Sequence, residues 1–254
     1  MIRKVGKEMF GMTLGKGAPE GKEAWWWNEK RDNDGRTPLI SAASNGDINL
    51  VKSLVNRGGN IEETDNLGNT ALVYATWYNH PATIEFLLSK GANIEHAQKD
   101  GHTPIFFAAR RGHLNLINLL IDKGADIEKR DVYGGTALIW AAREGTVDAV
   151  KALLSRCSEI DVRSNDQKTP LIHAAEMGHL DTVKYLVNRG VDIEAKDNAG
   201  ITAVLWATWN NHADIVNFLL FRSAFTKNAQ EGSEVTPICG AEGGHLSYVI
   251  EPRG

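Results

Sequence analysis

The sequence predicts an all-α solenoid of stacked helix-turn-helix units with β-hairpin fingers between them, and three observations indicate this fold. First, a threonine followed by proline or alanine recurs every 33 residues, at Thr37, Thr70, Thr103, Thr136, Thr169 and Thr202. Second, two stretches with apolar residues at helical spacing follow each threonine. Third, a short polar segment, in most units with a glycine, leads to the next threonine. Because one such unit cannot bury its own apolar face, the units are expected to stack.

The first helix of each unit is expected to begin at the threonine. A threonine at the N-cap can accept a hydrogen bond from an unpaired N–H, and proline is favoured at the first helical position. The six strings are TPLISAA, TALVYAT, TPIFFAA, TALIWAA, TPLIHAA and TAVLWAT. Their paired small residues, such as Ala42 and Ala43, allow neighbouring first helices to approach closely.

The second helix and the finger follow in each unit. In the first unit Ile48, Val51 and Leu54 give the second helix an apolar face. A glycine then supplies a left-handed cap, and the isoleucine of GGNIE, GANIE, GADIE or GVDIE is expected to pin the finger to the core. Gln167 replaces the turn glycine of the fifth finger and Cys157 replaces the glycine after the fourth outer helix, which predicts strain in the middle of the stack.

These strings resemble the ankyrin repeat, whose signature is T-P-L-H-x-A on a 33-residue period. The resemblance covers residues 32–250, with about seven repeats that start near residues 32, 65, 98, 131, 164, 197 and 230. The histidine of the signature is replaced by an apolar residue in every unit, so apolar packing is expected to take over its role. The last repeat is expected to be degenerate, with Thr236 as its threonine and an outer helix that meets Pro252 early. It is either a C-terminal cap or the end of a truncated product.

Residues 1–31 lack the period and are predicted to form a mildly basic, flexible tail. The adjacent Trp25, Trp26 and Trp27 lie just before the first finger. Two interpretations stay open for these indoles: they cap the stack, or they contact a partner.

Composition argues against several classes of function. With 28 basic and 32 acidic residues the chain has no basic excess, so no nucleic-acid partner is expected. Cys157 and Cys239 are far apart and form no metal or disulfide framework, which favours a reducing, cytoplasmic location. No apolar run approaches the roughly 20 residues of a membrane helix, so no membrane association is expected.

Neither catalysis nor a cofactor is predicted, because the sequence has no catalytic or phosphate-binding motif. The histidines that would suggest a metal or a general base hold one repeat position, where the resemblance implies a structural role; they are His80, His113, His179, His212 and His245. A second periodic row is acidic and is expected to form a solvated ridge: Glu62, Glu95, Glu128, Asp161 and Glu194.

The resemblance implies that a protein partner meets the finger tips and the concave face of the inner helices. The contact positions follow the paired small residues, and here they hold the tryptophan, tyrosine and arginine typical of binding hot spots. Residues three or four positions earlier share that helical face. The predicted binding residues are Tyr74, Trp77, Tyr78, Phe107, Arg110, Arg111, Trp140, Arg143, Glu144, Glu176, Met177, Trp206, Trp209 and Asn210. They predict a groove with aromatic ends and a basic centre.

The sequence therefore predicts a monomeric protein-protein interaction scaffold. The alternative is a regulatory or targeting module that is a fragment of a larger enzyme or secreted effector. The second and sixth units also resemble each other, as ATWYNHPATIEFLL and ATWNNHADIVNFLL. Either an internal duplication or a ligand with two similar anchors would produce that likeness.

Overall fold

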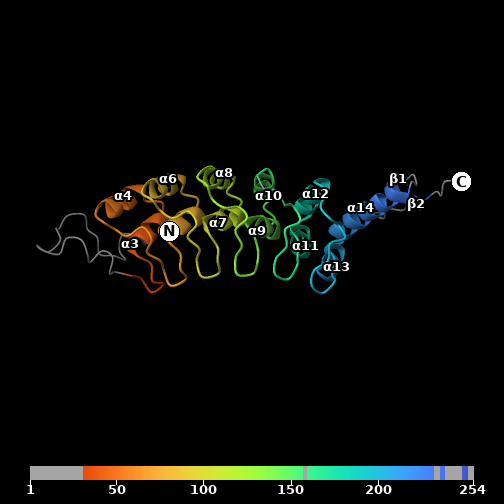
Figure 1. Ribbon diagram of the computed structural model, residues 1–254, viewed down its shortest axis with the longest axis horizontal. Helices are drawn as coiled ribbons and strands as arrows, with labels where there is room; N and C mark the ends of the chain where they lie inside the picture. Colours follow the sequence, from red (N-terminus) through yellow and green to blue (C-terminus); the bar gives the residue numbers. More distant parts are fainter. Residues whose placement is uncertain (1–30, 157–158, 232–234, 238–247, 251–254) are drawn as a thin grey trace, which may run out of the picture.

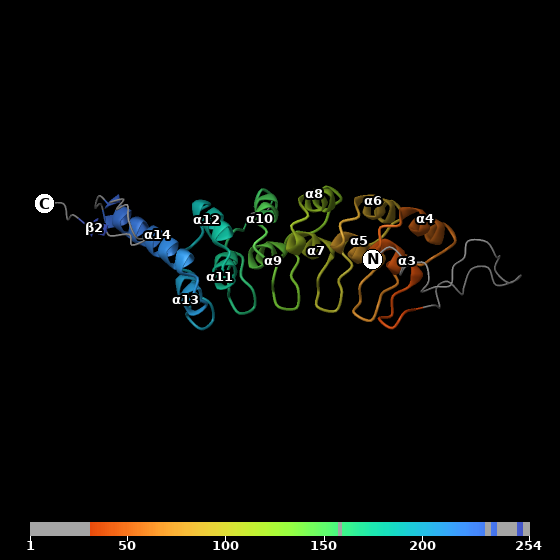
Figure 2. The same cartoon turned by 180° about the vertical axis from the view of Figure 1, so that it is seen from behind.

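The computed structural model describes residues 31–156, 159–231, 235–237 and 248–250. It consists of six consecutive pairs of helices, with inner helices in one row, outer helices in a second row and finger loops on the other side of the inner row (Figures 1 and 2). The inner helices are α3 Pro38–Ser44, α5 Ala71–Trp77, α7 Pro104–Arg111, α9 Ala137–Arg143, α11 Pro170–Glu176 and α13 Ala203–Trp209. The outer helices are α4 Ile48–Asn56, α6 Pro81–Ser89, α8 Leu114–Asp122, α10 Val147–Leu154, α12 Leu180–Asn188 and α14 Ala213–Glu231. The predicted helical solenoid is confirmed.

The inner helices begin as predicted, at the periodic threonines. The side chain of Thr37 accepts a hydrogen bond from the N–H of Ile40, and Thr70, Thr136 and Thr169 make the equivalent bond. Thr103 and Thr202 occupy the same position without it. The residues in place of the signature histidine are buried from Ile40 to Ile172, so apolar packing does hold these positions.

The periodic histidines connect neighbouring units. Each ring Nε2 lies within hydrogen-bonding distance of a carbonyl oxygen 36 residues earlier: His80 with Ser44, His113 with Trp77, His179 with Arg143 and His212 with Glu176. In the fourth unit, which has Thr146 in place of the histidine, Thr146 Oγ1 donates to the carbonyl of Ala109 over 2.8 Å. The structural role predicted for these four histidines is confirmed, and His245 lies outside the described residues.

The acidic row of the fingers differs from its prediction. Although Glu62 is exposed, its Oε1 accepts a hydrogen bond of 2.8 Å from the N–H of Asn93 in the next finger. Glu95 and Asp161 accept the corresponding bonds from the N–H groups of Asp126 and Asp192. These carboxylates tie successive fingers together and are not simply a solvated ridge. The fingers themselves are built from turns, and Lys196 with Thr202 is the one isolated bridge found within the described fingers.

The strain predicted in the fifth finger is confirmed at Gln167. This residue has φ of +61°, in the left-handed region where the other turns have glycine, for example Gly134 at +73°. L-residues with a side chain pay roughly 1 to 2 kcal/mol for this conformation. Cys157, the other expected sign of strain, lies outside the described residues.

The C-terminal end departs from the predicted seventh repeat. The stretch expected to form the sixth finger continues α14 to Glu231, because it contains no glycine to end the helix before Gly232. Thr236, expected to cap an inner helix, lies in strand β1 (Val235–Pro237), which pairs antiparallel with β2 (Tyr248–Ile250) in the stretch expected to form the last outer helix. Leu205 of α13 is 44% exposed, whereas its counterparts in the preceding inner helices are buried.

The predicted tail and its tryptophan cluster fall within residues 1–30, outside the described part of the chain. None of the described helices has both the length and the apolar character needed to cross a bilayer.

Candidate protein-binding surface

The ends of the inner helices and the bases of the fingers form one surface, which we call the inner face. It consists of the end residues of α5, α7, α9, α11 and α13, the aromatic residues one helical turn earlier, and the finger aspartates that contact them. Helical spacing of three or four residues puts these positions side by side. Side-chain hydrogen bonds between helices and fingers then fix their orientation.

Three finger aspartates hold three aromatic rings of the inner helices. Tyr74 Oη donates to Asp65 Oδ2 over 2.7 Å. Trp140 Nε1 donates to Asp131 Oδ2 over 2.6 Å, and Trp206 Nε1 donates to Asp197 Oδ2 over 2.9 Å. Donor and acceptor are nine residues apart each time, and the pairs occur in alternate units. The other oxygen of each aspartate accepts backbone N–H groups of its own finger, so the ring is attached to the turn that precedes its helix.

These hydrogen bonds keep Asp65 and Asp197 ionised. Burial raises the pKa of the Asp65 carboxyl, but the hydrogen bonds from Asn69 and Tyr74 outweigh burial and leave that pKa below its ordinary value. The pKa of Asp197 is lowered in the same way, with burial opposed by bonds from Ile201 and Trp206. Burial and the bond to Asp65 together raise the pKa of Tyr74 to about 12. The ring edges of Tyr74 and Trp206 therefore donate to a negative charge.

A cation lies over the face of each of these rings. Arg36 Cζ lies 5.0 Å from the ring centroid of Tyr74, and Lys168 Nζ lies 3.7 Å from that of Trp206. Trp140 has two, with Arg110 Cζ at 4.7 Å and Arg143 Cζ at 5.0 Å. A carboxylate bonded to the ring edge polarises the ring, which strengthens its attraction for a cation on the face. The inner face thus repeats one arrangement, in which a carboxylate bonds the edge of an aromatic ring and a cation lies over its face.

A continuous row of arginine and tryptophan occupies the centre of the inner face. Arg111 Cζ lies 4.7 Å from the ring centroid of Trp77 and Arg110 Cζ lies 6.0 Å from it. Since Arg110 also covers Trp140, the row runs in the order Arg111, Trp77, Arg110, Trp140 and Arg143. Arg110 is neutralised by Glu144, at 2.9 Å from Nη2 to Oε1. No ion pair joins Arg111 or Arg143 to any residue that the structure describes.

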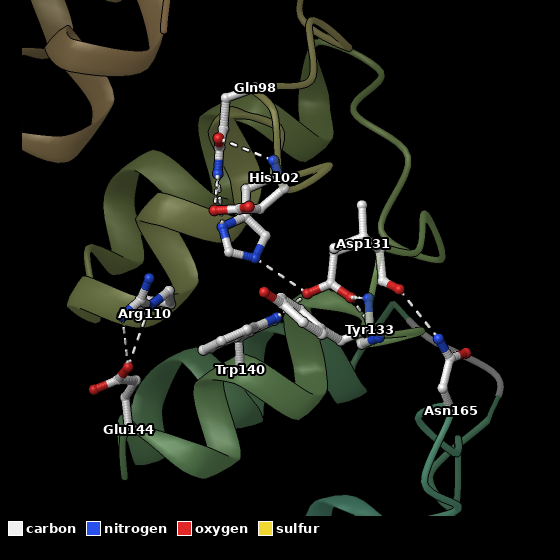
Figure 3. A network of polar contacts seen from close by, with 11 residues as sticks. Gln98, His102, Arg110, Asp131, Tyr133, Trp140, Glu144 and Asn165 are labelled. Atoms are coloured by element: carbon white, nitrogen blue, oxygen red, sulfur yellow. Dashed lines mark hydrogen bonds and ion pairs between the residues drawn. The ribbon is translucent and has the colours of Figure 1, made fainter. Parts of the chain in front are cut away.

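His102 lies between Gln98 and Asp131, next to Trp140 of the row (Figure 3). Its Nε2 lies 3.1 Å from Asp131 Oδ2, and Gln98 Nε2 lies 3.3 Å from its Nδ1. Burial lowers the pKa of His102 despite the Asp131 contact, so the ring is neutral at pH 7. A neutral ring with the proton on Nε2 donates to Asp131 and accepts from Gln98, which satisfies both nitrogens.

The two ends of the inner face are aromatic and apolar. Tyr74 and Tyr78 stack with centroids 6.4 Å apart, and Trp206 and Trp209 meet edge to face at 5.5 Å. Trp209 is 63% exposed and Tyr78 is 51% exposed. The aromatic ends and basic centre expected from the sequence are therefore present as an arrangement of side chains.

Four other residues that the sequence predicted for binding differ in their exposure and contacts. Phe107 is buried under Trp77, with ring centroids 4.9 Å apart, and is not available to a partner as the sequence predicted. Glu176 is half-buried in an ion pair with Lys168 at 2.8 Å. The Asn210 amide bonds to the Trp206 carbonyl of its own helix, whereas Met177 is exposed.

A pocket of about 550 Å³ opens between the fourth and fifth units of the inner face. Its lining includes Tyr133, Trp140, Arg143, Asp166 and His173. His173 is only 8% exposed, and neither of its ring nitrogens has a hydrogen-bond partner. Burial lowers the pKa of His173 to about 4, so this unpaired ring is neutral at pH 7. The exposed Tyr133 stands at the finger that borders the pocket.

Sequence reasoning missed Lys168, Tyr133, His102 and the three aspartates. The sequence did contain a pattern that could have identified the aspartates. The tyrosine and the two tryptophans at this position occur in units that have aspartate nine residues earlier, whereas the units with Gln98 and Ser164 there have Phe107 and His173. Tyr133 and Lys168 have no periodic counterpart, so nothing in the repeat pattern marked them.

A comparison with protein-family models matches the model described as ankyrin repeats (3 copies) to residues 18–98, 94–166 and 157–231. The chain belongs to the ankyrin-repeat family. No curated protein matches it. Ankyrin repeats are generally modules for protein interaction and typically are not enzymes. No group of three metal-ligating side chains is found in the described part of this ankyrin-repeat protein.

Proposed function

We propose that this ankyrin-repeat protein is a scaffold that binds another protein through its inner face and finger tips. The observation that carries the proposal is the row of Arg111, Trp77, Arg110, Trp140 and Arg143. Tryptophan and arginine are the residue types that dominate the energy of protein interfaces.

The row is suited to binding because it is ordered in advance. A guanidinium held on an indole face has already lost much of its side-chain freedom, so less entropy is lost when a partner engages it. Arg111 is exposed, and the one side-chain contact of its guanidinium found among the described residues is with the face of Trp77. The exposed Trp209 and Tyr78 add apolar area at the two ends.

Simultaneous replacement of Trp77, Arg110, Arg111 and Trp209 by alanine tests the proposal. The variant should lose the partner proteins that the natural chain captures from its native lysate, as identified by mass spectrometry, while circular dichroism shows unchanged helical content. A matched control carries Lys184→Ala, Tyr185→Ala and Arg189→Ala on outer helix α12 and should retain capture. Equal capture by the inner-face variant and the natural chain would rule out the inner face as the binding surface.

A further inference from the structure

We infer that the segment bound by the inner face is acidic, with carboxylates that pair with Arg111 and Arg143; this rests on the proposed function. The basis is the charge pairing of the cations on the face. Three of them already have a carboxylate partner: Arg36 pairs with Asp34 at 3.2 Å, Arg110 with Glu144 at 2.9 Å and Lys168 with Glu176 at 2.8 Å. Arg111 and Arg143 have none within the described residues.

The stacking of these two arginines determines which kind of ligand fits. A guanidinium whose Cζ lies over a ring still has five N–H donors, and it has no acceptor. Arg111 on Trp77 and Arg143 on Trp140 therefore present donors that need acceptors. A carboxylate accepts two parallel N–H groups from one guanidinium, which makes it the best-matched side-chain group. A basic segment is disfavoured, because the face of Trp140 already holds two arginines.

The buried aspartate near the row does not compete for these arginines. The Asp131 side chain is fully buried and its oxygens accept from Tyr133 N–H, Gly135 N–H, Trp140 Nε1 and His102 Nε2. Asp131 lines the same pocket as Arg143, but these four donors already occupy its oxygens. The guanidiniums of Arg111 and Arg143 have no ion-pair partner among the described residues and are available to a ligand.

The pocket beside Arg143 gives one of the carboxylates a defined position. Arg143 and His173 both line it. Neither ring nitrogen of His173 makes a hydrogen bond to a described residue, although Glu176 Oε2 lies 3.8 Å from Nδ1, and a buried nitrogen without a hydrogen bond is costly. A carboxylate in the pocket would accept from the Arg143 guanidinium and from the N–H of the neutral His173. Asp131 and Asp166 also line the pocket, and the Ser164 hydroxyl donates to Asp166. Lys168 Nζ lies 2.8 Å from Glu176 and 4.0 Å from Asp166, so this one cation serves both carboxylates.

Selection from a random library of displayed peptides, with the full chain as bait, tests this inference. Peptides selected by the natural chain should be enriched in aspartate and glutamate. The best synthetic peptide should lose roughly tenfold or more in affinity, measured by fluorescence anisotropy, when its acidic residues become asparagine or glutamine. Arg111→Gln with Arg143→Gln should lose a similar factor for the acidic peptide and little for its amide counterpart.

Two further variants separate geometry from net charge. Arg111→Lys with Arg143→Lys keeps the charge but loses the bidentate contact, so its affinity should lie between the natural chain and the glutamine variant. Lys184→Gln with Arg189→Gln on α12 removes the same charge elsewhere and should change affinity by less than about twofold. Circular dichroism verifies that all variants are folded.

Several outcomes would overturn the inference: selected peptides without acidic enrichment, no peptide whose binding depends on Arg111 and Arg143, or equal losses in the α12 control. Tighter binding of a single-stranded oligonucleotide than of the best peptide would also overturn it and favour nucleic acid. The lysate experiment with the alanine variant of the inner face separates the two proposals. If that variant loses the partner proteins while any of the outcomes above is observed, the inner face binds protein but the inference of an acidic segment is wrong. If the variant retains the partner proteins, the proposed function is wrong as well.

Discussion

The inner-helix rings of the second, fourth and sixth units differ from those of the third and fifth. Tyr74, Trp140 and Trp206 donate to a finger aspartate and remain half-buried, with a cation over the face. Phe107 and His173 have no such aspartate and are buried. An aromatic ring whose polar edge donates to a finger aspartate stays half-buried at the surface. A ring without this hydrogen bond is buried between the helices.

His173 shows what happens when the donor remains but the acceptor is absent. Nine residues earlier stands Ser164, whose hydroxyl bonds instead to Asp166 and to the carbonyl of Lys168. The imidazole therefore has two unpaired nitrogens and a pKa of about 4 because of burial. The ring donor of an inner helix is therefore satisfied only when the residue nine positions earlier, in the finger, is the aspartate that accepts from it.

The largest effect is expected when the aspartate of a supported ring is removed. Asp131→Ala leaves the N–H groups of Trp140, Tyr133 and Gly135 without their acceptor in a buried site. Because each unpaired buried group costs about 1 to 3 kcal/mol, the free energy of unfolding should fall by about 4 kcal/mol. Urea denaturation followed by circular dichroism measures this.

Ser164→Ala is the matched control at the equivalent position of the fifth unit. It removes hydroxyl bonds to a finger that supports no ring, and should cost about 1 kcal/mol. Equal losses in the two variants would show that the aspartate is not the support of the ring.

The second expected effect is an acid-sensitive loss of stability that depends on His173. Its pKa is about 4 in the folded protein against an ordinary 6.5, with burial as the main cause and Glu176, Asp166, Lys168 and Arg143 as the charged groups around it. Between these two values the unfolded chain binds a proton that the folded chain does not, so stability decreases as the pH falls from 6.5 towards 4. The shift corresponds to about 3 kcal/mol.

His173→Phe, which copies Phe107 of the third unit, should remove this component. The difference in unfolding free energy between pH 7 and pH 4 should be smaller in the variant by about 3 kcal/mol. At pH 7 the variant should be more stable by about 1 kcal/mol, because an apolar ring replaces unpaired nitrogens. An unchanged pH dependence would show that His173 is paired in solution.

Much of the fold could be predicted because the repeat specifies it locally. Threonine caps and periodic apolar residues locate each helix, and the repetition confirms the register six times. The C-terminal end was mispredicted because the threonine period suggested a further unit, while the absence of glycine before Gly232 let α14 continue. A recurring threonine marks a helix start only if the preceding helix has ended.

The inner face was harder to predict, because its contacts join residues of different units. The spacing of the repeat brought Trp77, Arg110 and Trp140 to one face, but it did not show that Arg110 covers both rings. Burial was also misjudged: Phe107 shares the face with Trp77 and lies beneath it. Side-chain length and stacking decide these contacts, and a repeat pattern contains neither.

The smallest expected effect compares the turns of the fifth and sixth fingers. Gln167 and Gly200 occupy equivalent positions with φ of +61° and +78°, and each N–H bonds to a carbonyl three residues earlier. Gln167→Gly should therefore raise the free energy of unfolding by about 1 kcal/mol, by relief of the left-handed conformation. Gly200→Gln should lower it by a similar amount, since a Cβ at Gly200 would meet no atom within 4 Å and only the backbone conformation is penalised. Opposite shifts in the thermal midpoints of the two variants are the expected result. If Gln167→Gly is instead destabilising, the glutamine side chain contributes more than its conformation costs, and the fifth finger is stabilised by that residue.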